Sequence, residues 1–144
     1  MEGILVPTIM HRSELDEFEQ MNIEHALDVY LRRKMSPQKL FSEESIRSIH
    51  KKMFGEVWSW AGEFRHTNKN IGIDKHQIGV ALRELCHDAL YWFIHKTYTP
   101  DEFSIRFKHR LVSIHPFPKG NGRHSRMVAY IIVTHIFKGT PFTW

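Results

Sequence analysis

The residues best suited to phosphate chemistry gather in one short segment, His115-Pro-Phe-Pro-Lys-Gly-Asn-Gly-Arg-His-Ser-Arg126. The neutral imidazole of His115 could accept the proton of a hydroxyl that attacks a phosphorus atom. Glycines at positions 120 and 122 let main-chain N–H groups approach a ligand without a Cβ in the way. At the start of a helix, unpaired N–H groups and the positive end of the helix dipole bind anions. We therefore expect Gly120, Asn121 and Gly122 to form an anion nest, with the Asn121 amide as a further donor.

Two arginines follow this nest. Arg123 and Arg126 are one helical turn apart, so their guanidinium groups can converge on one edge of the nest and hold a polyphosphate. Each feature is weak alone, because a lone histidine is usually an ordinary loop residue and short glycine motifs match by chance. The combination predicts a phosphate site with a base beside it.

Helical periodicity and helix-boundary residues predict the elements that position this segment. Thr99 and Glu102 suit the first turn of a helix, and Pro116 ends that helix near His115. After the glycines comes a run that is apolar on nearly all sides, which is typical of a helix at the centre of a bundle. The expected helices cover 14–33, a shorter stretch between Ser42 and Gly55, about 75–95, Thr99 to His115, and 127–137.

The stretch between Glu56 and Asp74 has a different pattern. Its first part is rich in aromatic residues. From Phe64 to Ile73, polar and apolar residues alternate loosely, and this part contains Gly72. This pattern predicts a small β-hairpin or an extended flap. The expected fold is therefore all-α, a helical bundle with a small β-hairpin flap, although an ordinary surface hairpin is the alternative for this stretch.

Length and composition limit the class of protein. A chain of 144 residues has the size of one domain, and no run of 18 apolar residues or signal-peptide pattern is present, so we expect a cytoplasmic protein that does not enter a membrane. Cys86 is the single cysteine and is expected to be a buried thiol in a reducing compartment. A formal charge of +4 favours an anionic partner. Because no nucleic-acid-binding motif is evident, we do not expect this partner to be a nucleic acid. The eleven histidines lack metal-ligand spacing, and no metal site is expected from them.

The segment resembles the signature of the Fic (Fic/Doc) family, His-x-Phe-x-(Asp or Glu)-Gly-Asn-Gly-Arg-x-x-Arg, at seven of its eight fixed positions. Residues 54–65 look like the family's segment leading into its flap, and residues 15–26 look like its first core helix. The resemblance covers nearly the whole chain and is strongest to the subgroup called mobile mystery protein B. It implies one Fic domain over residues 1–144. The sequence ends at Trp144, where the family usually continues with another helix, so the resemblance implies that this C-terminal helix is lacking.

The resemblance also implies an activity, protein adenylylation, in which AMP moves from ATP to a Ser, Thr or Tyr hydroxyl of a target protein. His115 would be the general base and Phe117 a core residue. Arg123 would contact a phosphate and Arg126 would hold the terminal one, so that the catalytic set is His115, Arg123 and Arg126. By this resemblance the nucleotide would be bound by Gly120, Asn121, Gly122, Arg123 and Arg126. Lys119 is a further candidate for binding it, although the family has an acid at that position. The flap would align the target chain through Arg65, Thr67, Asn68, Lys69, Asn70 and Ile71.

The sequence departs from the family at Lys119, where the signature has an acid that holds Mg²⁺ against the phosphates. A protonated lysine cannot bind a cation, so activity would be weakened. The ammonium could instead contact the phosphates directly, or it could be a solvated loop lysine. A catalytically impaired nucleotide- or partner-binding module is therefore the alternative. The inhibitory pattern Ser/Thr-x-x-x-Glu-Gly/Asn has no match, which implies that any restraint comes from a separate chain, as in a toxin–antitoxin pair.

Overall fold

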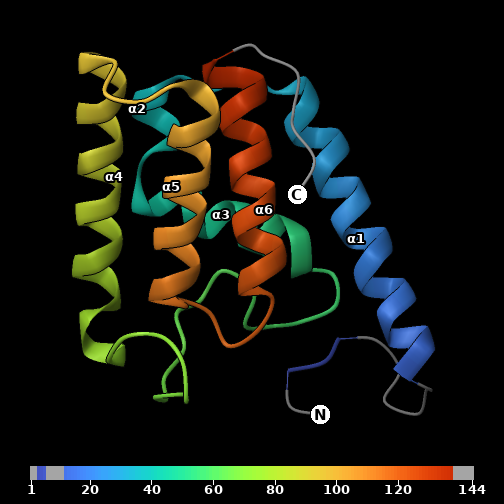
Figure 1. The fold of residues 1–144 in the computed structure, drawn as a ribbon. Coiled ribbons are helices and arrows are strands. Elements are labelled where there is room, and N and C mark those ends of the chain that lie inside the picture. Colours follow the sequence, from blue (N-terminus) through green and yellow to red (C-terminus); the bar gives the residue numbers. More distant parts are fainter. Residues whose placement is uncertain (1–2, 6–11, 138–144) are drawn as a thin grey trace.

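The computed structural model describes residues 3–5 and 12–137, and the helices of this part form one bundle (Figure 1). α5 (Pro100–Ile114) lies between α4 (Ile78–His95) and α6 (Asn121–Ile131), while α1 (Arg12–Arg32) packs on α3 (Glu43–Phe54). The remaining elements are short: α2 (Pro37–Leu40), the 3₁₀ turn η1 (Lys75–Gln77) and the π-helical stretch η2 (Ile132–Ile136) that continues α6. The all-α prediction is confirmed.

The helix starts follow the capping residues in the sequence. The Ser42 hydroxyl accepts a hydrogen bond from the N–H of Ser45 (3.2 Å) at the start of α3, and the Thr99 hydroxyl accepts from the N–H of Glu102 (3.3 Å) at the start of α5. Such caps satisfy N–H groups that have no partner inside the helix. Both starts therefore lie where the sequence predicts them. The predicted break at Pro37 is instead the first residue of α2, a position that proline tolerates because its missing N–H is not needed there.

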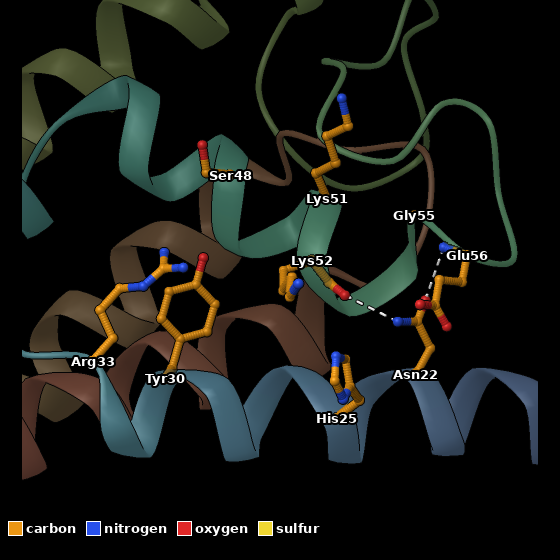
Figure 2. Close-up of a pocket in the computed structure, with 9 residues that line it drawn as sticks. All are labelled: Asn22, His25, Tyr30, Arg33, Ser48, Lys51, Lys52, Gly55 and Glu56. Atoms are coloured by element: carbon orange, nitrogen blue, oxygen red, sulfur yellow. Dashed lines mark hydrogen bonds between the residues drawn. The ribbon is translucent and has the colours of Figure 1, made fainter.

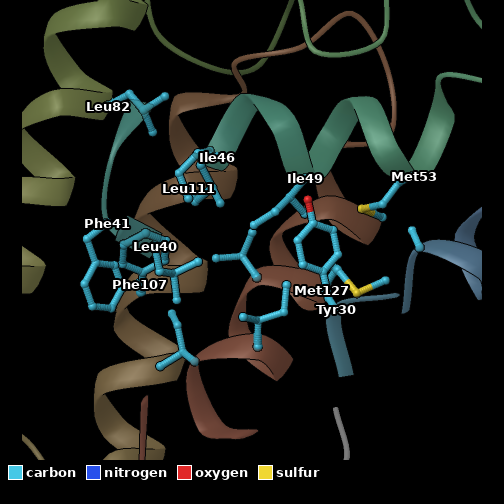
Figure 3. Packing of buried hydrophobic residues seen from close by; sticks show 14 of the residues in the cluster. Tyr30, Leu40, Phe41, Ile46, Ile49, Met53, Leu82, Phe107, Leu111 and Met127 are labelled. Atoms are coloured by element: carbon cyan, nitrogen blue, oxygen red, sulfur yellow. The ribbon is translucent and has the colours of Figure 1, made fainter. Parts of the chain in front are cut away.

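The core is formed by buried side chains of α1, α3, α4, α5 and α6, together with Leu40 and Phe41 at the end of α2 (Figure 3). Fully buried apolar side chains of the core include Ile46, Leu82, Phe107 and Val128. Burying each such side chain stabilises the fold by roughly 1.5–3 kcal/mol relative to leaving it exposed. Both helices that flank the glycine-rich segment, α5 and α6, are thus fixed by the core.

Cys86 belongs to the same core, and the prediction of a buried thiol is confirmed. Burial, with a smaller effect of Glu43, raises the pKa of the thiol to about 12, so it stays protonated. Within the described ranges, no helix is long and apolar enough to span a membrane.

The predicted β-hairpin did not form. Residues 65–73 contain bends and turns but no strand, and in the part of the chain that the structure describes the one β-bridge joins Ile4 and Trp58. The reason is that both ends of this stretch pair with the end of α5 and the residues after it rather than with a second strand. The N–H of Arg65 donates to the carbonyl of Pro116 (2.9 Å), and the N–H of Ile73 donates to the carbonyl of Ile114 (3.4 Å).

Candidate functional site: the loop between α5 and α6

The loop between α5 and α6 turns the chain through two left-handed residues. His115 has φ 54° directly after α5, and Gly120 has φ 80° directly before α6. A Cβ on Gly120 would lie 2.5 Å from Cζ of Phe54, so this position needs glycine for both its backbone angle and its space. The loop lies at the same end of the bundle as the segment between α3 and α4 (Figure 1).

The buried Asn121 side chain stabilises the loop through two hydrogen bonds to Phe117. Its Oδ1 accepts from the N–H of Phe117 (3.0 Å), and its Nδ2 donates to the carbonyl of Phe117 (2.8 Å). The side chain is buried, with 3% of the residue exposed. The expectation that the Asn121 amide donates to a ligand is therefore corrected, because both ends of the amide are used within the loop. The predicted anion nest would then depend on main-chain N–H groups.

Two buried histidines hold the loop and α6 against α3. His50 Nδ1 accepts from the N–H of Gly62 (3.0 Å), so its Nε2 carries the proton and donates to the carbonyl of Lys119 (2.9 Å). Burial is the main cause that lowers the pKa of His50 to about 4. His124 Nε2 pairs with the carbonyl of Ile46 (2.9 Å), and burial lowers its pKa well below the usual value. Both rings are therefore neutral at pH 7 and act as structural groups.

The pKa of His115 is also lowered, first by burial and then by the positive charges of Arg65 and Lys69. The ring is thus neutral at pH 7, the form that can accept a proton. Its Nδ1 is buried and has no hydrogen-bond partner among the described residues, which leaves Nε2 as the nitrogen that a ligand can meet.

Arg65 is buried and ties the flap segment to the end of α5. Its guanidinium donates to the main-chain carbonyls of His115 (2.6 Å), Thr67 (2.9 Å), Ile73 and Ile114 (3.2 Å). Only 3% of the residue is exposed. Its position is therefore that of a cap on the last carbonyls of α5, where a positive charge is favourable, rather than that of a surface group.

The other residues predicted for the flap lie on the surface. All five are exposed, and Ile71 presents a large apolar side chain with 64% of its surface exposed. Gly72 approaches the end of α5 so closely that a Cβ would lie 2.7 Å from Cβ of His115. The flap segment thus lies next to His115, and Thr67, Asn68, Lys69, Asn70 and Ile71 present exposed side chains there.

Lys119 and Arg123 both reach a carboxylate on α1. Lys119 Nζ lies 3.5 Å from Oε2 of Glu19, and Arg123 Nη1 lies 3.6 Å from Oε1 of the same residue. The indole N–H of Trp58 donates to Glu19 Oε2 (2.7 Å). Lys119 is therefore not a freely solvated loop lysine. Sequence reasoning did not assign Glu19, Trp58 or His50 to the site, because their partners lie far away in the chain.

Arg126 is exposed and lines, together with Arg123, a hollow of about 310 Å³ between α1 and α6. The two arginines thus border one hollow, and their convergence on the glycine nest stays a prediction. The walls of the hollow are mostly apolar, formed by Gln20, Ile23, Leu27, Met127 and Tyr130.

A second hollow, of about 390 Å³, lies between α1 and α3 (Figure 2). It contains no residue of the 115–126 segment and is lined by Arg33, Lys51 and Lys52 among others. Asn22 at its edge donates to the carbonyl of Lys52 (3.0 Å) and accepts from the N–H of Glu56 (3.1 Å), as the dashed lines in Figure 2 show. This hollow marks the α1–α3 contact and is separate from the loop.

Fold and site together define a class: an all-helical protein whose glycine-rich loop, followed by two arginines, opens a buried helix. The model of the Fic/DOC family matches residues 40–133, and this chain belongs to that family. No curated protein matches the chain.

Solved Fic structures share the fold. One is the N-terminal Fic domain of a putative cell filamentation protein from Bartonella quintana, with TM-score 0.72 and 20% identity over 87% of this chain and 66% of that one. Another is BepC from Bartonella tribocorum with bound AMPPNP, with TM-score 0.72 and 20% identity over 93% of this chain and 75% of that one. A third is Fic-1 from C. elegans, with TM-score 0.68 and 21% identity over 95% of this chain and 41% of that one. The chain thus spans between about two fifths and three quarters of the length of these relatives.

Proposed function

We propose that this protein is a Fic-type adenylyltransferase that moves AMP from ATP to a Ser, Thr or Tyr hydroxyl of a target protein. The observation that carries the proposal is the position of a neutral His115 at one end of a loop whose other end opens α6 with main-chain donors and two arginines. Membership in the Fic/DOC family and the AMPPNP bound to the similar BepC support ATP as the nucleotide.

In the proposed reaction, the target hydroxyl oxygen attacks the α-phosphorus of ATP. The new O–P bond forms as the bond from this phosphorus to pyrophosphate breaks, and His115 takes the hydroxyl proton. The N–H groups at the start of α6 stabilise negative charge on the phosphate. Arg123 and Arg126, which border the same hollow, hold the leaving phosphates.

Mg²⁺ does not fit the residues of this loop. The position of the expected acid is Lys119, and the carboxylate that reaches the loop, Glu19, is already paired with Lys119 and Arg123. Among the residues that the structure describes, no three His, Cys, Asp or Glu side chains form a group that could hold a metal ion. The proposed step therefore relies on the cationic side chains and the main chain.

We also propose that the target protein lies along residues 65–73, beside His115, and that residues 1–144 act as one Fic domain. A separate antitoxin-like chain would supply any restraint of the activity. The exposed residues 66–72 support the first part, because the main chain and side chains there are accessible next to the base.

The test is incubation of the protein with ATP labelled in the α-phosphate and with a cell lysate, compared with His115→Ala. We expect labelled protein bands that disappear in the variant. Equal, background-level labelling with both proteins would refute the transfer.

The alternative function is a nucleotide- or partner-binding module without catalysis. The observation that favours it is the lysine at position 119, whose ammonium is paired with Glu19. The Lys119→Glu variant separates the two, because a gain of Mg²⁺-dependent labelling from an inactive parent would show that the lysine disables an otherwise competent site. Calorimetry with ATP, with and without Mg²⁺, then measures binding alone.

A further inference from the structure

Glu19 contributes a carboxylate to the site from outside the region that the family model matches, residues 40–133. It lies on α1, and only 2% of the residue is exposed. A buried carboxylate is costly unless it is paired and hydrogen-bonded. Here the Trp58 indole N–H fixes Oε2 at 2.7 Å, while Lys119 and Arg123 approach the two carboxylate oxygens.

The two cations are each held on more than one side. Lys119 Nζ lies 5.0 Å from the centre of the Trp58 ring, and its main-chain carbonyl accepts from His50. The Arg123 guanidinium lies 4.9 Å from the centre of the Phe54 ring. Aromatic faces attract cations at these distances. The lysine and the arginine therefore have defined positions next to the α6 N-terminus.

The Glu19 side chain is more deeply buried than the two cationic side chains that contact it. The Glu19 side chain is 3% exposed, whereas those of Lys119 and Arg123 are 41% and 37% exposed. An ammonium has three donors and a guanidinium has five, so each cation can contact Glu19 and keep donors for a ligand on its exposed side. The order from inside to outside is a fixed carboxylate, two cations, and then solvent where a phosphate would lie.

We infer that Glu19 is a positioning residue of the phosphate site, which holds Lys119 and Arg123 side by side so that both can bind the phosphates of one ligand. This inference rests on the proposed nucleotide binding. Without the carboxylate, two like charges next to each other would repel and move apart. Because Glu19 is fixed by Trp58 and buried, it orients the cations and does not need to leave when a phosphate arrives.

The experiment compares the wild type with Glu19→Gln, Glu19→Asp and the control Glu17→Gln. Glu17 is exposed on the same helix two residues away, so its substitution removes the same charge from a different face. Glu19→Asp keeps the charge but shortens the side chain by one methylene. This variant therefore distinguishes the effect of the carboxylate's position from the effect of its charge. Thermal unfolding checks that all four proteins are folded.

The first readout needs no nucleotide. Lysine acylation under limiting reagent, followed by mass spectrometry, compares Lys119 with the exposed Lys34. We expect Lys119 to react faster relative to Lys34 in Glu19→Gln and Glu19→Asp, and at the wild-type rate in Glu17→Gln. Unchanged reactivity in both Glu19 variants would overturn the inference, because Lys119 would then not be held by Glu19.

The second readout is the Kd for ATP, measured by calorimetry without added metal. We expect it to rise about 10- to 100-fold in both Glu19 variants, the range typical of losing a group that orients a binding residue. Tighter binding in Glu19→Gln would overturn the inference and identify Glu19 as an anion that competes with the phosphate. If the wild type fails to bind ATP while Lys119 reactivity changes as expected, the proposed function fails and the contact of Glu19 with Lys119 stands.

Discussion

Replacement of Gly120 by alanine tests the geometry of the loop most sharply. A non-glycine residue at φ 80° costs about 1–2 kcal/mol, and a close contact in a packed interior costs about 1–3 kcal/mol more. Here the new Cβ would meet Phe54 at 2.5 Å and 2.7 Å, and the ring is buried with 1% of the residue exposed. We therefore expect Gly120→Ala to lower the free energy of unfolding by about 2–5 kcal/mol.

The assay is urea denaturation followed by tryptophan fluorescence, with thermal unfolding as a second measurement. For a chain of this size the expected loss corresponds to a fall in Tm of roughly 10 °C. The same loop opens the proposed phosphate site, so affinity for ATP should fall as well.

Gly122→Ala is the matched control. An added Cβ there meets nothing within 4 Å, and the residue lies inside α6, where alanine is the better helix former. Stability should stay constant or rise by up to ~1 kcal/mol, yet ATP should bind more weakly because the Cβ stands beside the main-chain donors. If both variants lost the same stability, or if Gly120→Ala lost less than about 0.5 kcal/mol, which is the usual effect of a surface change, the account of the loop would be wrong.

Three further predictions concern the groups around the loop. Lowering the pH from 7 to 5 should reduce the free energy of unfolding by about 2 kcal/mol through His50, because the unfolded ring takes up a proton near pH 6.5 and the folded ring only near pH 4. Urea denaturation at both pH values measures this loss. The His50→Phe variant should lose less stability over the same pH range. Asn121→Asp removes the donor to the Phe117 carbonyl and should cost about 1–3 kcal/mol in the same assay. Arg65→Gln should raise the pKa of His115, observed by NMR titration of the imidazole, because the guanidinium that disfavours its charged form is lost.

Each of these has a result that would count against it. Stability that stays constant between pH 7 and 5 would mean that His50 is not buried as a neutral ring. Wild-type stability in Asn121→Asp would mean that the amide faces solvent. An unchanged pKa of His115 in Arg65→Gln would mean that Arg65 does not lie against the end of α5.

The sequence alone was sufficient for α1, α3, α4, α5 and the break after α5 because their signals are local. It did not predict α2, and α6 begins at Asn121 rather than at the predicted 127. Ser42 and Thr99 cap the helices that they precede, and Pro116 and Gly120 enclose the break between α5 and α6. These effects depend on residues within one turn of each other. The hairpin prediction was wrong, since the alternation from Phe64 to Ile73 was weak and Arg65 forms tertiary contacts that alternation cannot reveal.

The missed residues are those whose role depends on distant partners. Glu19 meets Lys119 a hundred positions later, and His50 donates to the carbonyl of Lys119 across 69 positions. In the sequence, Glu19 is recognised only as part of the segment that resembles the family's first core helix, and His50 as one of eleven histidines. For Asn121, the sequence indicates that the side-chain amide forms hydrogen bonds but not with which partner, because an amide can face either a ligand or its own loop.

In the proposed function, the loop that begins at His115 transfers AMP from ATP to target proteins. The most direct measurement supplies a lysate with ATP labelled either in the α-phosphate or in the γ-phosphate, and follows the label on proteins. We expect α-label on target proteins with the wild type, none with His115→Ala, and no γ-label above background with either. Transfer of γ-label, or α-label that is independent of His115, would contradict it.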